Sequence, residues 1–327
     1  MENPPKPSSD ANAGSLRIVF MGTPALAAHV LERLIAASDR GFSVVGVVTR
    51  PDQPRKRGLK LGPSEVGAVA ARHGLATLKP TRIRTPEFLA ELKGFAPDLL
   101  VVVAYGRILP NPVLDAARIM PINVHASLLP RHRGAAPIEG AILAGDRESG
   151  VTIMRITQQM DAGPILLQRA IDLAPDETQG SLKARLAELG AAALIEALQT
   201  VRAGRVVEMP QDEARVTFTA PITKEDSEID WTSDAAQIDR MVRAYDPWPV
   251  ARTVYGGEDL LLWKVEPRPE ANPGSPGTLI ALKPEPLVRC GNGSLALLEV
   301  QAPGRRRMRA ADFFRGRRAA VGSPIGH

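Results

Sequence analysis

An asparagine and a histidine two residues apart form the pair in this sequence best suited to acyl-transfer chemistry. Asn123 and His125 lie in the apolar segment MPINVHAS (120–127), which is predicted to be a strand. Residues two apart on a strand point to the same face, and the carboxyl end of a strand in an open α/β sheet borders the ligand crevice. The imidazole can relay a proton there, and the amide can donate to a developing oxyanion. Such a pair by itself is more often structural than catalytic.

A carboxylate follows in the segment QQMDAGP (158–164), a predicted loop between two β-like segments. Asp161 stands shortly before a glycine and a proline, so its backbone is turn-like and its side chain could reach the same crevice. A buried carboxylate there would orient the imidazole and stabilise its charged form, as in a catalytic triad. An aspartate that only closes an Asx-turn is the alternative.

The sequence lacks the motifs of several other enzyme classes. Ser127 shares a strand face with His125, but no G-x-S-x-G motif is present, which argues against a serine hydrolase. MGTP (21–24) supplies one glycine where a dinucleotide-binding fold needs a glycine-rich fingerprint, and no P-loop is present. The histidines form no zinc motif, so we expect no metal site. Cys290 is the only cysteine, so no intrachain disulfide is possible and a reducing compartment fits.

Strands and helices must alternate to position these residues. The predicted strands are 16–21, 42–49, 98–106, 120–127 and 150–156. The predicted helices are 25–37, 64–73, 85–95 and 180–204. This alternation, without an internal repeat, predicts an α/β fold with a doubly wound, mostly parallel sheet.

The composition and the predicted secondary structure of the chain change after residue 204. We expect a disordered N-terminus over 1–15, a catalytic domain over 16–204, a polar linker over 205–225 and a second domain over 226–320. The second domain has one helical pattern followed by short β-like runs with turn signals, which predicts a small β-barrel. No apolar run is long enough to cross a bilayer and no targeting segment is recognisable, so we expect a cytoplasmic protein without a membrane partner.

The net charge of +5 is unevenly distributed. Residues 50–60 (RPDQPRKRGLK) carry +4 and residues 305–318 (RRRMRAADFFRGRR) carry +6, which leaves about −5 on the rest of the chain. Clustered cations release phosphate counterions, so two such segments favour a polyanionic partner. Solvated surface charge is the alternative for either segment alone. Aromatic residues make up only 4% of the chain, so we expect nucleic-acid contacts mainly to phosphates.

The block NVHASLLPRHRGAAP (123–137), together with the later MDAGP (160–164), resembles the folate-dependent formyltransferase family over nearly the whole chain. The resemblance implies a Rossmann-like catalytic domain, an OB-like second domain and 10-formyltetrahydrofolate as the formyl donor, with no metal. It implies that Asn123, His125 and Asp161 form the catalytic trio. The residues that it places at the folate site are Ser127, Leu128, Leu129, Pro130, Val103, Ala104, Tyr105 and Gly106.

Two features favour the branch of this family that formylates methionyl-initiator-tRNA for translation initiation: the basic insertion at 50–60, and the second domain with its basic tail. The residues expected to bind tRNA are Arg50, Arg55, Lys56, Arg57, Lys60, Arg305, Arg306 and Arg307. The family resemblance suggests a monomer. Formylation of a small amine, such as an amino sugar or a ribonucleotide, is the alternative with the same chemistry. A non-catalytic RNA-binding protein on the same scaffold is the alternative of another class.

One departure from the family pattern falls in the second domain. The family's usual Asn-Pro-Trp-Pro-Gly-Ala is replaced by DPWPVA (246–251). Since valine stands where the family has glycine, we expect a turn that needs no residue with positive φ at position 250.

Overall fold

The computed structural model of the chain describes residues 15–55, 60–269 and 274–326. The chain divides into two compact units. The first contains the described parts of Met1–Pro130, with Val151–Arg169 and Leu186–Ala214. The second contains Arg131–Gly150, Ala170–Arg185 and the described parts of Arg215–His327. Of the N-terminus predicted to be disordered, residues 1–14 lie outside the described residues.

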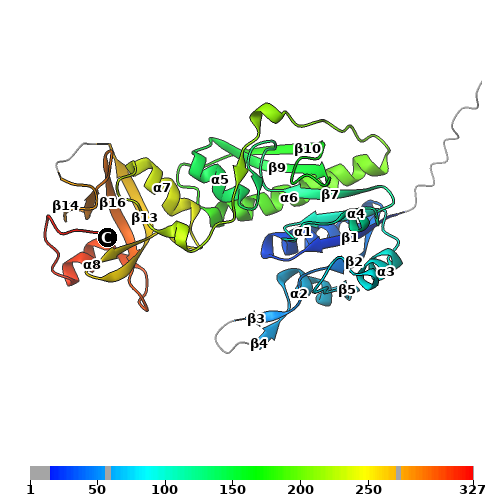
Figure 1. Cartoon of the computed structure of the whole chain (residues 1–327), viewed down its shortest axis with the longest axis horizontal. Coiled ribbons are helices and arrows are strands. Elements are labelled where there is room, and N and C mark those ends of the chain that lie inside the picture. Colours follow the sequence, from blue (N-terminus) through cyan, green and yellow to red (C-terminus); the bar gives the residue numbers. More distant parts are fainter. Residues whose placement is uncertain (1–14, 56–59, 270–273, 327) are drawn as a thin grey trace, which may run out of the picture. The chain divides into compact units, whose positions relative to one another are not determined.

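A seven-stranded sheet with the strand order β10-β9-β7-β6-β1-β2-β5 runs through the first unit (Figure 1). The strands are β1 (Leu16–Gly22), β2 (Phe42–Val48), β5 (Thr77–Leu78), β6 (Leu99–Val103), β7 (Met120–His125), β9 (Glu148–Arg155) and β10 (Ile165–Asp172). The neighbours from β5 through β2, β1 and β6 to β7 pair in parallel, whereas β7 and β9 are antiparallel. The predicted mostly parallel α/β sheet is therefore confirmed.

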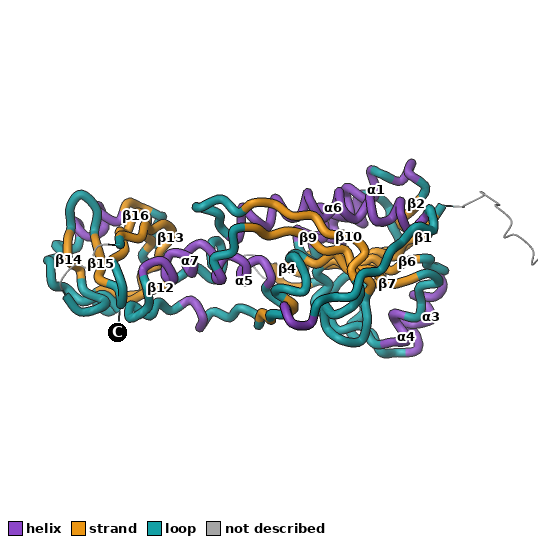
Figure 2. The backbone as a smooth tube through the Cα atoms, turned by 90° about the horizontal axis from the view of Figure 1, so that it is seen from above, coloured by secondary structure: helices purple, strands orange, loops and turns teal. Residues whose placement is uncertain are grey.

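Helices cover both faces of this sheet. They are α1 (Ala25–Ala36), α2 (Glu65–Arg72), α3 (Pro86–Gly94), α4 (Asn111–Leu114) and α6 (Gln179–Arg202). Figure 2 shows α1 and α6 on one face and α3 and α4 on the other. None of the helices in the described part of the chain is both long and apolar enough to span a membrane.

Local sequence signals explain where two of these helices begin. Ser64 caps α2 by accepting a hydrogen bond from the Gly67 amide at 2.9 Å, and Thr85 caps α3 in the same way. Side chains along β1 alternate between the two faces of the sheet. Val19 and Met21 lie on the same face and form one buried cluster with Phe88 of α3. A doubly wound sheet results, buried on both faces.

The second unit contains an antiparallel sheet with the strand order β12-β13-β16-β15-β14, and β17 pairs with β16. Its strands are β12 (Arg252–Tyr255), β13 (Glu258–Arg268), β14 (Leu279–Ala281), β15 (Leu287–Arg289), β16 (Ser294–Gln301) and β17 (Met308–Arg309). A two-stranded parallel pair joins β8 (Arg133–Gly134) to β11 (Phe218–Thr219). The predicted short strands of the second domain are thus present.

Three helices of the described residues lie wholly within this unit: α5 (Pro137–Ala144), α7 (Ala235–Ala244) and α8 (Ala310–Gly316). Of these, only α7 was expected from the sequence. In the described part of the chain, three short 3₁₀ turns complete the helical elements: η1 (Ser38–Arg40), η2 (Glu213–Arg215) and η3 (Glu225–Ser227). The apolar core of the second unit brings α7, β13, β16 and α8 together around Ile238, Leu262, Leu297 and Phe314.

The expectation for position 250 is wrong. Val250 has φ +68°, the left-handed conformation that glycine would adopt without strain. Left-handed backbone costs a residue with a Cβ roughly 1–2 kcal/mol. The Val250 side chain is buried, and burying a valine contributes about 1.5–3 kcal/mol. Burial therefore offsets the strain, which a reading of local turn preferences could not anticipate.

Candidate active site

Strand β7 carries the first two members of the predicted trio. Asn123 lies opposite Val102 of β6 and Met154 of β9, and His125 lies opposite Thr152 of β9. Because the two residues are separated by one position, their side chains leave the same face of the sheet. His125 is the last residue of the strand and is 6% exposed, so little solvent competes for its ring nitrogens.

Asp161, the third member, lies in the loop between β9 and β10. Its Oδ2 is 3.8 Å from Nδ1 of His125, and its side chain is 17% exposed. This separation allows the carboxylate to attract a protonated imidazole. The backbone of Asp161 has φ +50°, so the loop turns sharply at this residue. The structure thus brings Asp161 to His125, as the sequence predicted.

The conformation of the aspartate loop is held by a residue from the predicted linker. The side-chain amide of Gln211 donates to the carbonyl oxygens of Asp161 and Gly163, each at 2.8 Å. A Cβ on Gly163 would overlap the carbonyl oxygen of Arg155, so only glycine fits there. Sequence reasoning missed Gln211, because its part of the chain has the polar, proline-containing composition of a spacer.

A second network fixes the segment that follows β7. The Thr152 hydroxyl donates to the Ser127 carbonyl at 2.7 Å and accepts from the Leu129 amide at 3.0 Å. The Gln168 side chain donates to the Leu129 carbonyl at 2.8 Å and to the Thr152 hydroxyl at 2.9 Å. Ser127, Leu129 and Pro130 are buried and Leu128 is half-buried, so of these four side chains Leu128 is the most accessible to a ligand. Thr152 and Gln168 were not predicted.

The other predicted folate segment, Val103–Gly106, begins at the carboxyl end of β6. Since β6 and β7 are parallel neighbours, this segment and the Ser127–Pro130 segment meet at one edge of the sheet. Ala104 and Gly106 are exposed and have positive φ, whereas Val103 and Tyr105 are buried. Burial raises the pKa of the Tyr105 phenol, with Arg107 and Arg50 acting in the opposite direction. Tyr105 therefore stays neutral at physiological pH.

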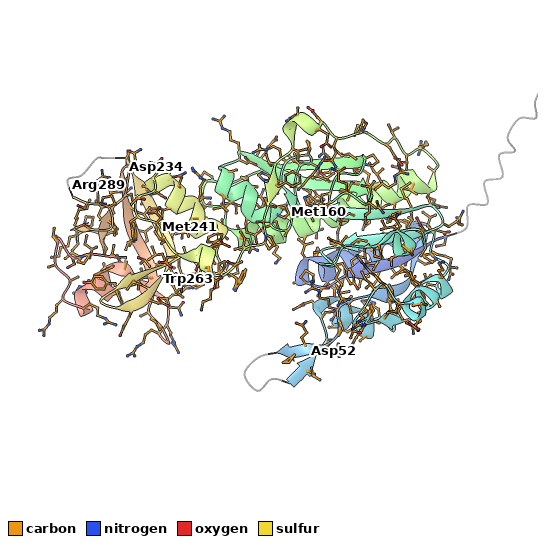
Figure 3. The ribbon with its side chains drawn as sticks, viewed as in Figure 1. Asp52, Met160, Asp234, Met241, Trp263 and Arg289 are labelled. Carbon is orange, nitrogen blue, oxygen red and sulfur yellow. The ribbon has the colours of Figure 1, made fainter. Side chains whose placement is uncertain are left out.

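The basic insertion is an antiparallel hairpin of β3 (Gln53–Arg55) and β4 (Lys60–Gly62). At its base, Asp52 pairs with Lys79 at 2.6 Å; Figure 3 labels Asp52 there. Lys56 and Arg57 lie outside the described residues, and only the backbones of Arg55 and Lys60 are described.

Arg50 precedes this hairpin and contacts the predicted folate segment. Its guanidinium donates to the Gly106 carbonyl at 2.6 Å. The base of the hairpin and the folate segment therefore share a hydrogen bond.

The remaining predicted RNA-binding residues belong to the second unit. Arg305 and Arg306 are exposed in the turn between β16 and β17. The Arg307 guanidinium lies over the ring of Trp263, with its central carbon 3.1 Å from the ring centre, and its Nη2 is 3.9 Å from Asp246. Within residues 15–55, 60–269 and 274–326, no group of three His, Cys, Asp or Glu side chains is arranged to hold a metal ion.

The fold is shared with solved structures of low sequence identity. The N-formyltransferase of Helicobacter canadensis matches with a TM-score of 0.64 at 16% identity, over 88% of this chain and 99% of that chain. HypX of Aquifex aeolicus, solved in complex with tetrahydrofolic acid, matches with a TM-score of 0.59 at 19% identity, over 92% of this chain and 47% of that chain.

Sequence comparisons extend this likeness over most of the chain. The formyl transferase family matches residues 16–198, and the formyl transferase C-terminal domain matches residues 221–318. The methionyl-tRNA formyltransferase of Methylococcus capsulatus is 48% identical over 95% of this chain and 100% of its own length. That of Geobacter metallireducens is 43% identical over 95% of this chain and 99% of its own length. These relatives match the chain across both of its domains, and the chain belongs to the methionyl-tRNA formyltransferase family.

Proposed function

We propose that this chain transfers the formyl group of 10-formyltetrahydrofolate to the α-amino group of methionyl-initiator-tRNA. The observation that carries the proposal is the juxtaposition of Asn123, His125 and Asp161 at the carboxyl end of β7. We assign the chemistry to a catalytic domain at 16–204 and RNA binding to 226–320, with a linker at 205–225. The family matches at 16–198 and 221–318 support this division.

The reaction is a direct transfer between two nitrogens. The methionyl α-amine, with a pKa of ~8, is neutral in a useful fraction near pH 7 and attacks the formyl carbon. A bond from that nitrogen to the formyl carbon forms, and the bond from the formyl carbon to the folate nitrogen breaks. The proton lost by the amine ends on the departing folate nitrogen, so the products are formylmethionyl-tRNA and tetrahydrofolate.

Each member of the trio has one role in this scheme. Asn123 donates its amide N–H to the oxyanion of the tetrahedral intermediate. His125 accepts the proton from the attacking nitrogen and passes it to the leaving nitrogen. Asp161, 3.8 Å from the His125 ring, orients the imidazole and offsets the positive charge that the ring carries during the proton transfer. The low exposure of His125 keeps water from competing for that proton.

The donor is assigned to the edge where the segments 103–106 and 127–130 meet. The exposed apolar side chain of Ile108, at 69% of its maximum, follows the first of these segments and supports contact with a planar pteridine. Arg107 holds this loop by donating to the carbonyl oxygens of Pro80 and Thr81, each at 3.1 Å. The accessible backbone at Ala104 and Gly106 supplies polar groups for the same ring.

The acceptor is assigned to the two basic segments. The hairpin at 50–60 would bind the acceptor stem of the tRNA, and the turn at Arg305–Arg307 would bind phosphates elsewhere on the same RNA. Arg50 belongs to this assignment through its bond to Gly106, which ties the base of the hairpin to the donor site. We further assign the chain to the cytoplasm as a monomer that supports translation initiation.

The deciding experiment incubates the full chain with 10-formyltetrahydrofolate and one of three acceptors: methionyl-initiator-tRNA, an amino sugar or glycinamide ribonucleotide. We expect formylmethionine on the tRNA and no formylated small amine. If only a small amine is formylated, the proposed acceptor is wrong and the proposed formyl-transfer reaction stands. RNA binding without any formyl transfer would instead favour the non-catalytic RNA-binding protein.

A further inference from the structure

A tryptophan in the second unit fixes the arginine turn, the segment 302–307 between β16 and β17. Trp263 Nε1 donates to the Gln301 side chain at 2.8 Å, and that side chain donates in turn to the Arg305 carbonyl at 2.8 Å. The Arg307 guanidinium stacks on the same indole. Figure 3 labels Trp263 on β13, the strand beside β16. One indole therefore holds both ends of the Arg305–Arg307 segment.

The three arginines of the turn are all exposed, but only one of them has partners at its guanidinium among the described residues. Arg307 is 47% exposed and contacts Trp263 and, at 3.9 Å, Asp246, whereas Arg305 and Arg306 extend from the ordered turn into solvent. A turn that is already ordered loses less conformational entropy when it binds a phosphate chain. The arrangement therefore suits binding of a polyanion better than the exposed charge alone would suggest.

An exposed tryptophan, Trp248, lies near the arginine turn, because it is two residues from Asp246, which contacts Arg307. Trp248 is 57% exposed and follows Asp246 by two residues, so their Cα atoms are at most about 7 Å apart. The loop that carries it is closed by the Val250 amide, which donates to the Tyr245 carbonyl at 2.9 Å. The Asp246 carbonyl also accepts from the Gly180 amide at 3.0 Å. The indole is thus presented on an ordered loop, and its exposure leaves a large apolar surface in contact with water.

The neighbouring charges favour RNA as the occupant of that surface. Every nucleobase has a π-face that can stack on an indole, and proteins that bind single-stranded RNA combine such stacking with cationic grooves. We propose, on the basis of the RNA acceptor in the proposed function, that Trp248 stacks on an unpaired or terminal base of the bound tRNA while Arg305 and Arg306 bind its phosphates. The protein would then contact the face of a nucleobase as well as phosphates, whereas the low aromatic content of the chain predicted contacts mainly to phosphates.

Binding of an uncharged initiator-tRNA transcript to the full chain, measured over a series of salt concentrations, tests this inference. Trp248→Leu is expected to weaken binding by about 5- to 100-fold with no change in the salt dependence, because no phosphate contact is lost. Trp248→Phe, which keeps an aromatic face, is expected to stay within about threefold of the unmodified chain. Phe218→Leu is the matched control, since Phe218 is another exposed aromatic side chain of this unit.

Variants of the arginine turn should behave differently. Arg306→Ala is expected to weaken binding and to reduce the slope of log affinity against log salt by about one. Trp263→Leu is expected to reduce the slope as well, because the turn loses its template. A loss of affinity without a change in the salt slope therefore indicates stacking, and a loss of affinity with a smaller slope indicates phosphate binding.

Fluorescence keeps the test valid if Trp248→Leu fails to fold. RNA should quench the emission of the unmodified chain and should quench Trp248→Phe much less. The inference is overturned by unchanged affinity in a folded Trp248→Leu, by an equal loss in Trp248→Phe and Trp248→Leu, or by equal quenching in both fluorescent forms. It is also overturned if sedimentation shows that Trp248 joins two copies of the chain. Absence of formyl transfer to methionyl-tRNA by the unmodified chain overturns the proposed function, and this inference with it.

Discussion

Two regions of the molecule are built in opposite ways. One is the edge of the first unit's sheet where Asn123, His125 and Asp161 meet, to which we assign catalysis and which we call the catalytic edge. The other is the arginine turn of the second unit. At the catalytic edge, His125, Ser127 and Thr152 are buried, and hydrogen bonds to backbone carbonyls fix the segments around them. At the arginine turn, Arg305 and Arg306 are exposed, and one indole orders the backbone beneath them. Polar groups in a low-dielectric environment are strongly oriented, whereas exposed charges act at longer range and are screened by salt.

This difference assigns a distinct kinetic signature to each region. Changes at the catalytic edge should act on kcat, because they alter the geometry in which the formyl group moves. Changes at the arginine turn or the basic hairpin should act on KM for tRNA and on its salt dependence. A variant at the catalytic edge that changes only KM for tRNA, or a variant at the arginine turn or the basic hairpin that changes only kcat, would contradict this difference between the two regions.

The largest effect is expected for Asn123→Ala. Loss of one oxyanion donor typically lowers kcat by about 10²–10³, and KM for tRNA should hardly change. Single-turnover formylation of methionyl-tRNA measures both quantities. Asn111→Ala is the control, since Asn111 is an exposed residue at the start of α4. Near-normal turnover in a folded Asn123→Ala would remove Asn123 from the mechanism.

Much of this catalytic edge could be predicted because its signals are local. Asn123 and His125 share a strand, and the run of apolar residues that defines β6 identifies it as a buried parallel strand. Caps at Ser64 and Thr85 likewise mark helix starts within a few residues. The sequence pattern therefore predicted the sheet and the position of Asn123 and His125 on it.

The supporting residues could not be predicted, since their partners are distant in the chain. Gln211 reaches across 50 residues to the Asp161 carbonyl, and Gln168 reaches 39 residues to the Leu129 carbonyl. No periodicity marks such a contact. The left-handed backbone at Val250 was mispredicted for a related reason, because burial in the assembled core overrides the local preference of valine.

The basic hairpin should give the next largest effect. Replacing Arg55, Lys56 and Arg57 by alanine is expected to raise KM for methionyl-tRNA by about 10- to 100-fold and to reduce the salt slope by about three. The value of kcat at saturating tRNA should stay close to normal, because the catalytic edge is unchanged. Initial rates over a series of tRNA and salt concentrations test this. Unchanged tRNA kinetics would identify the hairpin charges as ordinary solvated surface.

A smaller effect is expected from Gln211→Ala, which removes both hydrogen bonds to the aspartate loop. The loop should lose its fixed conformation, and a misplaced carboxylate should lower kcat by about tenfold while tRNA affinity remains the same. Gln199→Ala on the exposed face of α6 is the matched control. A rise in KM for tRNA with unchanged kcat would show that the linker serves RNA binding instead of catalysis.

The smallest effect is expected from Asp246→Asn beside the arginine turn. Burial raises the pKa of the Asp246 carboxyl above its ordinary value of 3.8, while the charge of Arg307 lowers this pKa and that of Glu299 raises it further. The native state therefore binds more protons than the unfolded state between 3.8 and the raised pKa, so the stability contributed by this group is largest below 3.8 and is lost as pH rises through the folded pKa.

Asparagine at this position removes that loss, so the stability of Asp246→Asn relative to the unmodified chain should increase from about pH 4 to about pH 7 in urea unfolding. Removing a carboxylate that lies 3.9 Å from Arg307 should also tighten tRNA binding by about twofold at low salt. Asp176→Asn makes the same change in net charge at an exposed loop position after β10 and is expected to leave tRNA affinity unchanged. A stability difference that is constant over this pH range would show that Asp246 titrates alike in both states, and equal tRNA affinities in the two variants would separate Asp246 from the RNA-binding surface.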